Sequence, residues 1–319
     1  MLAISSAPLS SDVLGGEPRS PSADDSRARQ SGSTETGFER NEDEKANARY
    51  FTEVAVPELE RWNKRSTHCR FVVINDIHLS PGEPRELPQV ILRLNKLRPD
   101  FVVFLGDLNN SQSAPDSEID AAFKTLFEVT ANHAEFPCYY GMGNTDVNAG
   151  ADSCEVFRRW AKTKPYYSFD HGGMHFVMLY TEKDKPERFG IVSSEQLHWL
   201  EEDLKEQAIG MPVVLFGHHA LYEWAGKWEK DNWGIENSAQ LLALLRPFHL
   251  VATFSGHRHL NRMSLDERHV LHVINGPMVG DHSDDIGPKQ DGKGYRWVTI
   301  TNDKIHTTWI QIGTAPISP

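Results

Sequence analysis

Short apolar runs alternate with helical patterns from about His68 onward. We expect buried strands at Phe71–Ile74, Phe101–Leu105, Phe176–Tyr180, Val213–Phe216 and Val251–Ser255. Between them, apolar residues recur at helical spacing over Leu87–Leu97, Ile119–Thr130, about Glu195–Gln207 and Ser238–Leu245. Toward the end of the chain, Val270–Ile274, Trp297–Thr301 and Ile305–Ile312 predict strands without intervening helices. An alternation that ends in strands indicates a layered α/β domain.

Three of the predicted helices carry a signal at their first turn. Ser117 with Asp120, and Ser193 with Gln196, have the spacing of a capping box. Asn237 precedes the last of the helices and is expected to cap it.

The first fifty residues differ in composition from the rest. Only 6 of these 50 residues are Val, Ile, Leu or Phe, about 12% against the roughly 20% that a folded core requires. They contain neither the basic region nor the uninterrupted apolar stretch of a secretory signal. We expect a disordered N-terminal tail at residues 1–50, with a regulatory or docking arm as the alternative. The expected organisation continues with a linker or N-terminal extension at 51–66, a folded domain at 67–313 and a C-terminal tail at 314–319.

Composition and charge disfavour several classes of protein. No apolar run approaches the roughly 20 residues that span a bilayer, so we expect a cytoplasmic protein with no membrane partner. The three cysteines cannot form a disulfide framework, and their spacing matches no zinc motif. A formal net charge of −12 disfavours nucleic acid as a partner.

Polar clusters follow five apolar runs, at the points where the predicted strands end. In chain order they contain Asp76 and His78, then Asp107 and Asn109, then Asn144 and Asp146 after Tyr139-Tyr140, then His218 and His219, and last His257, Arg258 and His259. Four of the five clusters have a glycine just before the polar residue, which allows a tight exit turn. Because ligands of open α/β sheets bind at the carboxyl ends of the strands, we expect these side chains to share one rim.

The residue types in these clusters indicate a metal site. Imidazoles mixed with carboxylates and a carboxamide suit first-row metals such as Mn, Fe, Co or Zn. Seven such side chains are too many for one tetrahedral zinc, but they suit two metals roughly 3.5–4 Å apart that share a carboxylate. Each short motif alone is also explained by a turn or a capped core histidine. The ten remaining histidines, among them His171 and His175, are interpreted as surface or core residues.

The ordered motifs resemble those of the calcineurin-like metallophosphoesterases over about Phe71 to Ile312. The motifs are Asp-x-His, Gly-Asp, Gly-Asn-Thr-Asp, Gly-His-His and Gly-His-x-His. Ser193–Leu204 further resembles the cyclic-nucleotide phosphodiesterase and purple acid phosphatase branch. The Ser/Thr protein phosphatase branch fits poorly, because Leu108-Asn109-Asn110 replaces its acidic-arginine-glycine sequence. The resemblance implies two mixed β-sheets packed face to face with helices outside, a four-layer α/β/β/α sandwich.

The resemblance also implies a role for each site residue. The first metal would be held by Asp76, His78 and His259, the second by Asn144, His218 and His257, and Asp107 would bridge both. A metal-bridging hydroxide would attack phosphorus in a small phosphodiester or phosphomonoester. The metals and Asn144 would neutralise charge on the phosphoryl oxygens, with Arg258 as a further substrate-binding candidate. His219 could exchange roles with His218.

Thr145 departs from the family pattern, which has a histidine there to assist the leaving oxygen and orients it through the next Asp. Threonine is not a useful acid near neutral pH, so His219, Arg258 or Asp146 would substitute, or good leaving groups would be preferred, or catalysis would be weak. General-acid help is worth about 10²–10⁴-fold.

Three hypotheses therefore stay open: a dinuclear phosphoesterase, a metal-binding relative with weak or lost catalysis, and a nuclease of the same fold, which the acidic charge disfavours. A further stretch with Tyr222, Trp224, Trp228 and Trp233 is either an aromatic lid or a self-anchored loop.

Overall fold

The computed structural model describes most of the chain from Phe51 to Gly313. The described ranges are 51–55, 68–110, 115–147, 153–182, 189–221, 233–278, 292–301 and 304–313. The predicted tails at 1–50 and 314–319 lie outside them, as do Tyr222, Trp224 and Trp228.

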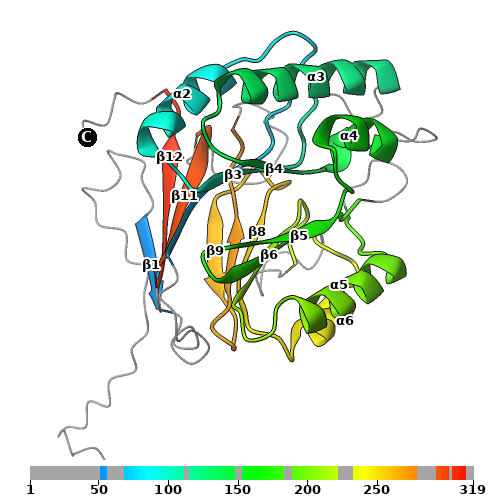
Figure 1. The fold of residues 1–319 in the computed structure, drawn as a ribbon, viewed down its shortest axis with the longest axis vertical. Coiled ribbons are helices and arrows are strands. Elements are labelled where there is room, and N and C mark those ends of the chain that lie inside the picture. Colours follow the sequence, from blue (N-terminus) through cyan, green and yellow to red (C-terminus); the bar gives the residue numbers. More distant parts are fainter. Residues whose placement is uncertain are drawn as a thin grey trace, which may run out of the picture. The chain divides into compact units, whose positions relative to one another are not determined.

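Two six-stranded sheets form the centre of the domain (Figure 1). The first sheet has the order β1-β12-β11-β2-β3-β4, with β1 at Phe51–Ala55, β2 at His68–Ile74, β3 at Phe101–Leu105, β4 at Cys138–Gly141, β11 at Gly294–Thr301 and β12 at Lys304–Gln311. The second has the order β5-β6-β7-β8-β10-β9, with β5 at Tyr167–His171, β6 at Met174–Met178, β7 at Val213–Phe216, β8 at Leu250–Ser255, β9 at Arg262–Leu265 and β10 at Leu271–Ile274. Both are mixed, since β2-β3-β4 and β6-β7-β8-β10 are parallel and the remaining pairs antiparallel.

The core between the sheets is rich in aromatic rings. Phe71 stacks on Phe101 of the same sheet, with ring centroids 5.2 Å apart. Its ring also meets Phe176, Phe216 and Phe254 of the second sheet edge-on, at 5.5 to 5.8 Å. Edge-to-face contacts of this kind add to the burial of apolar area that holds the two sheets together. The sheets therefore pack face to face.

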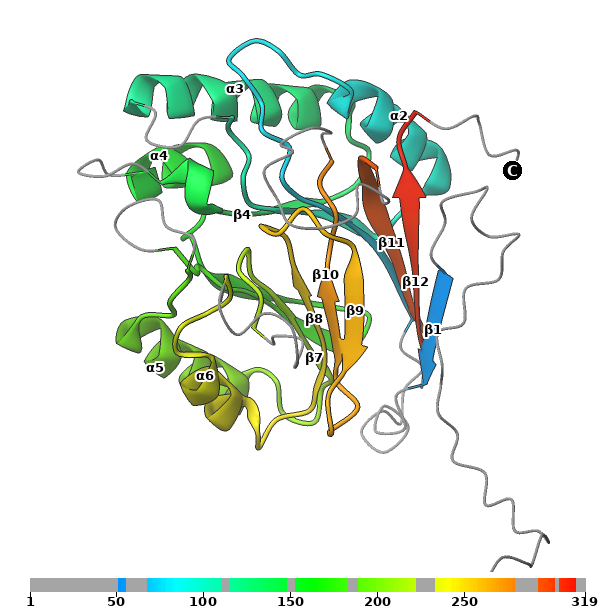
Figure 2. The same ribbon diagram turned by 180° about the vertical axis from the view of Figure 1, so that it is seen from behind.

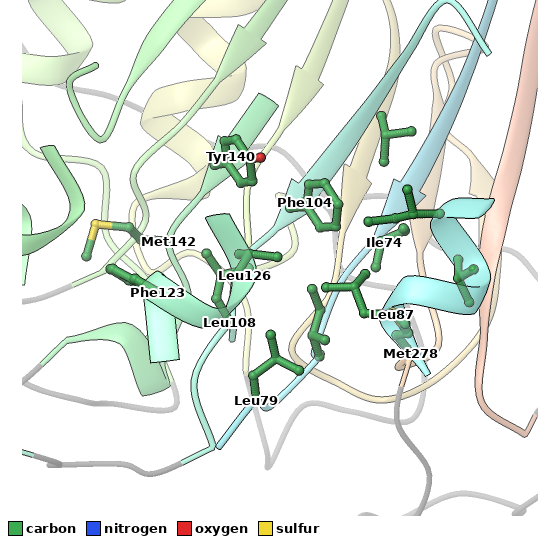
Figure 3. Packing of buried hydrophobic residues seen from close by; sticks show 14 of the residues in the cluster. Ile74, Leu79, Leu87, Phe104, Leu108, Phe123, Leu126, Tyr140, Met142 and Met278 are labelled. Atoms are coloured by element: carbon green, nitrogen blue, oxygen red, sulfur yellow. The ribbon is translucent and has the colours of Figure 1, made fainter. Parts of the chain in front are cut away.

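Helices cover the outer face of each sheet (Figures 1 and 2). The first sheet is covered by α2 (Leu87–Leu97), α3 (Asp116–His133) and α4 (Ser153–Ala161), and the second by α5 (Ser194–Glu206) and α6 (Ser238–Leu245). In Figure 3, Leu87 of α2 and Phe123 and Leu126 of α3 gather with Ile74 and Phe104 of the strands. The predicted four-layer α/β/β/α sandwich is confirmed. Among the described helices, none is both long and apolar enough to cross a membrane.

Of the three predicted capping signals, one is confirmed in part: Ser193 caps its helix, but the Gln196 side chain pairs with the backbone of Tyr180 and does not complete the box. Ser193 caps α5, since its Oγ accepts a hydrogen bond from the backbone N of Gln196 at 3.1 Å.

The predicted box at the start of α3 is wrong, because the N-cap position is Pro115, two residues before Ser117. Asp120 instead accepts from the indole Nε1 of Trp160 at 2.8 Å. The Asp120 side chain, which the pattern assigned to a cap, thus makes a tertiary hydrogen bond to α4 instead.

Asn237 precedes α6 but makes no side-chain cap. Its amide instead pairs with the backbone of Val192, accepting from N at 3.0 Å and donating to O at 2.8 Å. Four of the helices and strands were not predicted: α4, β5, β9 and β1. The last falls inside the expected linker or extension at 51–66 and adds an edge strand antiparallel to β12.

Candidate metal centre

All five polar clusters meet at the carboxyl ends of parallel strands from both sheets. Three follow β2, β3 and β4 of the first sheet, and two follow β7 and β8 of the second. The apolar pattern predicted one rim but not that two sheets would share it.

The first group of candidate ligands contains Asp76, His78, Asp107 and His259. One donor atom from each lies within 4.8 Å of the others. His259 Nε2 is 3.3 Å from Asp76 Oδ1 and also 3.3 Å from His78 Nε2. His78 Nε2 is 3.8 Å from Asp107 Oδ2.

The second group contains Asp107, His218 and His257, and Asn144 adjoins it. His218 Nε2 lies 3.2 Å from Asp107 Oδ1 and 3.2 Å from Asn144 Oδ1. The same amide oxygen lies 2.8 Å from His257 Nδ1. Asp107 therefore belongs to both groups, with one carboxylate oxygen toward each, which is the arrangement of a bridging ligand.

Backbone carbonyls fix how two of the imidazoles are turned. His218 Nδ1 lies 3.0 Å from Leu105 O, and His78 Nδ1 lies 3.3 Å from Asn109 O. Only a ring N–H donates to a carbonyl, so each Nδ1 carries a proton and each Nε2 is directed into the cluster. Metal-binding histidines are commonly oriented in this way.

The backbone at the site adopts a sparsely populated conformation. Five candidate ligands have left-handed φ angles, namely Asp76 at 50°, His78 at 48°, Asp107 at 49°, His257 at 66° and His259 at 49°. For residues other than glycine this costs on the order of 1–3 kcal/mol each, and such strain clusters at functional sites. Hydrogen bonds between the first two loops hold it in place, from Asp76 N to Gly106 O at 3.1 Å and from His78 N to Asp107 O at 3.0 Å.

Glycine lets the loops after β3 and β4 approach closely. A Cβ added at Gly143 would lie 2.3 Å from the backbone N of Asp107. No larger residue fits there without displacing the loop that carries the shared carboxylate.

Opposite charges are tightly coupled in this buried cluster. Burial by itself lowers the pKa of His218, but the Asp107 carboxylate overrides it and holds that pKa well above its usual range. Conversely, burial raises the pKa of Asp107, and His218 overrides it and holds that pKa well below the usual range. Burial and the neighbouring His219 and His218 lower the pKa of His257. Shifts in both directions within one cluster are typical of functional sites.

Asp146, predicted as catalytic, has its carboxylate hydrogen-bonded to the backbone of the two neighbouring loops. Its carboxylate accepts from the backbone N of Leu108 at 2.9 Å, of Asn109 at 3.0 Å and of Gly143 at 2.8 Å. Burial first, and the charge of Asp107 next, raise its pKa to about 7. These contacts favour a positioning role over the predicted contact with the reacting groups.

Thr145 is also turned into the protein. Its hydroxyl donates to Asn109 O at 2.8 Å, and its backbone N donates to Asp107 Oδ1 at 2.9 Å. The residue that replaces the family's histidine therefore orients the shared carboxylate through its main chain.

His219 occupies a different place from His218. Its Nδ1 lies 3.2 Å from Glu182 Oε1 and 3.0 Å from Thr181 Oγ1, and its ring centroid is 4.3 Å from that of His257. This geometry favours His218 over His219 as the ligand.

Glu182 was missed by the sequence analysis, and it lies further along the chain from the end of β6 than Asp76 or Asp107 lies from the end of its strand. Its carboxyl is buried, and burial raises its pKa to about 8.

Arg258 and Trp233 form a pair at the edge of the site. The guanidinium carbon of Arg258 lies 4.6 Å from the centroid of the Trp233 ring. The same indole lies 5.4 Å from the His257 ring, centroid to centroid. Of the four aromatic residues in the predicted lid or loop, the described one thus contacts the site.

Two solved structures share the fold. A dimetal phosphatase from Danio rerio is 15% identical, with a TM-score of 0.54, and covers 76% of this chain and 99% of its own. GAP50, the anchor in the inner membrane complex of Plasmodium, is 15% identical, with a TM-score of 0.50, and covers 78% of this chain and 86% of its own. At this identity the likeness concerns the fold alone.

Sequence comparison identifies the family. A Danio rerio protein described as a transmembrane protein with metallophosphoesterase domain is 32% identical over 95 residues, which are 30% of this chain and 20% of that protein. The match thus spans about a fifth of that relative's length. The model of the calcineurin-like phosphoesterase family matches residues 69–261, more than half of the chain. The chain belongs to the calcineurin-like phosphoesterase family.

Proposed function

We propose that this protein is a dinuclear metal-dependent phosphoesterase that hydrolyses a small phosphodiester or phosphomonoester. The observation that carries the proposal is the Asp107 carboxylate, which has one oxygen toward His78 and the other toward His218. Family membership supports hydrolysis of phosphoesters, and the two ligand groups support two metals.

The residues present fit two first-row cations. Asp76, His78 and His259 would hold the first, Asn144, His218 and His257 the second, and Asp107 both. Neutral imidazole nitrogens, carboxylates and a carboxamide oxygen are the donors that Mn, Fe, Co or Zn prefer. Two bound cations would polarise the phosphoryl group as Lewis acids and acidify water at the site.

The chain's own residues would bind the substrate and move the proton. Asn144, whose Oδ1 faces the two histidines, has an Nδ2 amide able to donate to a phosphoryl oxygen. Arg258, held against Trp233, is the cation at the edge of the site. His219, held at Nδ1 by Glu182, would protonate the leaving oxygen in place of the missing histidine at Thr145.

Thr145 also favours a second candidate function, a metal-binding protein with weak or lost catalysis. Its hydroxyl is engaged with Asn109 and cannot donate a useful proton near neutral pH. In this case the two metals bind, but hydrolysis is weak or absent even with a good leaving group.

A phosphodiesterase assay separates the two candidates. Manganese-loaded protein is expected to hydrolyse bis-nitrophenyl phosphate, and removal of the metals with a chelator should abolish the reaction reversibly. Full metal occupancy without turnover would support the second candidate. A panel of small phosphoesters then identifies the substrate class, and the cytoplasmic location expected from the sequence stays a prediction.

A further inference from the structure

A second kind of ligand cluster lies at the other end of the strands. Cys69, Asp100 and His171 each offer a donor atom within 4.8 Å of the other two. Cys69 is the second residue of β2, whereas Asp76 follows the last. Five steps of strand, at about 3.3 Å each, lead from Cys69 to Ile74 at the end of β2, so about 17 Å of strand separates this cluster from the end where the candidate dinuclear centre lies.

The three donors come from both sheets and are held by independent contacts. The Asp100 carboxylate accepts from the backbone N of Arg70 at 2.6 Å, and the guanidinium Nη2 of Arg70 lies 3.7 Å from its other oxygen. His171, at the end of β5, directs Nε2 toward Asp100 Oδ2 at 3.8 Å and packs edge-on against Phe101 at 5.5 Å. The Cys69 side chain is buried in the core between the sheets.

The imidazole and the carboxylate of this cluster are more exposed to solvent than the sulfur. The side chains of His171 and Asp100 are 39% and 23% exposed, whereas Cys69 is fully buried. A cation could therefore enter past the imidazole and carboxylate and meet the sulfur last.

One sulfur, one nitrogen and one oxygen donor are chemically selective. Thiolate is a poor ligand for Mg²⁺ or Ca²⁺, whereas Zn²⁺ accepts Cys, His and Asp in a tetrahedral arrangement whose fourth position water can fill. We propose that Cys69, Asp100 and His171 form a mononuclear Zn²⁺ site that ties β5 of the second sheet to β2 and β3 of the first. On binding, the thiol proton is released to solvent, and sulfur, Nε2 and a carboxylate oxygen become the ligands. The alternative is an ordinary ion pair of His171 with Asp100 beside a buried thiol.

Co²⁺ absorption tests this site separately from the candidate dinuclear centre. Only a thiolate ligand produces the sulfur-to-Co²⁺ charge-transfer band, and none of the seven residues of the other centre is a cysteine. Titration of the full-length protein with Co²⁺ should give this band with the intensity of one thiolate-bound Co²⁺ per chain, complete once all three sites are filled, and an excess of Zn²⁺ should remove it.

Variants assign the band to its ligands. Cys69→Ser should abolish it, and His171→Ala, at a partly exposed position, should weaken Co²⁺ affinity about 10-fold or more. Cys138→Ser is the matched control and should retain the band, as should Asp107→Ala, so failure here is distinguishable from failure of the proposed function. Absence of the band from the native chain, or its persistence in Cys69→Ser, would overturn the proposal and leave the ion pair.

Discussion

Two buried histidine clusters in this domain differ in the groups that surround their ring nitrogens. His175, between the second sheet and α5, has Nδ1 2.7 Å from Asp170 Oδ1 and Nε2 2.9 Å from Asp203 Oδ2. Both ring nitrogens are thus satisfied by carboxylates of the chain itself. At the candidate metal centre, by contrast, the Nε2 atoms of His78 and His259 face each other at 3.3 Å.

The difference distinguishes a structural histidine from a ligand. These two nitrogens converge with carboxylate oxygens of Asp76 and Asp107, and a cation among them could be bound by all four side chains. The interpretation of His175 as a core residue agrees with its paired contacts. Burial alone therefore does not separate the two kinds of histidine, but the convergence of several imidazoles on shared carboxylates does.

Removal of the shared carboxylate should have the largest effect. Asp107→Ala is expected to lower phosphodiesterase activity about 10³-fold or more, since the metals supply several kcal/mol of transition-state stabilisation. The measurement is kcat/KM on bis-nitrophenyl phosphate. Asp203→Ala, which removes a carboxylate from a histidine in the other cluster, should keep activity within a few-fold. Similar losses in both variants would show that the two clusters do not differ as argued.

Replacement of His219 should separate substrates by their leaving groups. His219→Gln is expected to lower the rate on an alkyl phosphodiester about 10²-fold, while the nitrophenyl rate changes little, because nitrophenolate leaves without a proton. His218→Gln should lower both rates together through the loss of a metal ligand. Equal losses in His219→Gln, at equal metal content, would contradict a role in proton transfer.

The His175 cluster, which consists of His175, Asp170 and Asp203, should make the free energy of unfolding depend on pH. Burial lowers the pKa of His175, but the hydrogen bonds to Asp203 and Asp170 raise that pKa by more than burial lowers it. The net shift is therefore upward. A raised folded-state pKa gives stability that is complete below the ordinary value of about 6.5 and is lost as pH rises through the folded value.

Asp203→Asn should lower the free energy of unfolding by about 2 kcal/mol near pH 6 and by less at high pH. Denaturant unfolding of metal-free protein from pH 6 to 9 measures this. The difference between the variant and the native chain subtracts the titration of the candidate metal centre. A pH-independent difference would mean that His175 is neutral in the folded state.

Truncation should have the smallest effect and leave both clusters intact. A chain that begins at Phe51 keeps β1 and is expected to melt within about 1 °C of the full chain, because the composition of residues 1–50 cannot build a core. A chain that begins at His68 loses β1 and should melt at a lower temperature. A clear loss already in the first chain would show that the tail packs on the domain.

The sequence predicted the fold well because apolar runs and strand ends are local features. Val213–Phe216 and Phe101–Leu105 have the predicted bounds, since a buried strand needs a continuous apolar run. Hydrogen bonds between residues far apart in the chain could not be predicted. Asp120 accepts from Trp160, and Asn237 accepts from Val192, where the pattern had assigned each side chain to a helix cap.

The site shows the same limit. Motif order predicted which residues gather, but the orientation of Asp146 depends on the loop after β3. Glu182 was not predicted because Leu179, Tyr180 and Thr181 separate it from the end of β6, whereas a single residue separates Asp76 or Asp107 from its strand.

The metal content of purified protein tests the central account most directly. Elemental analysis of the Cys69→Ser variant, which lacks the proposed zinc site, should find two first-row metal ions per chain at the candidate dinuclear centre. With Asp107→Ala added, both should be lost, whereas Asp203→Ala should retain two. Two metals in the Asp107 variant, or none in the native chain after metal loading, would contradict the account.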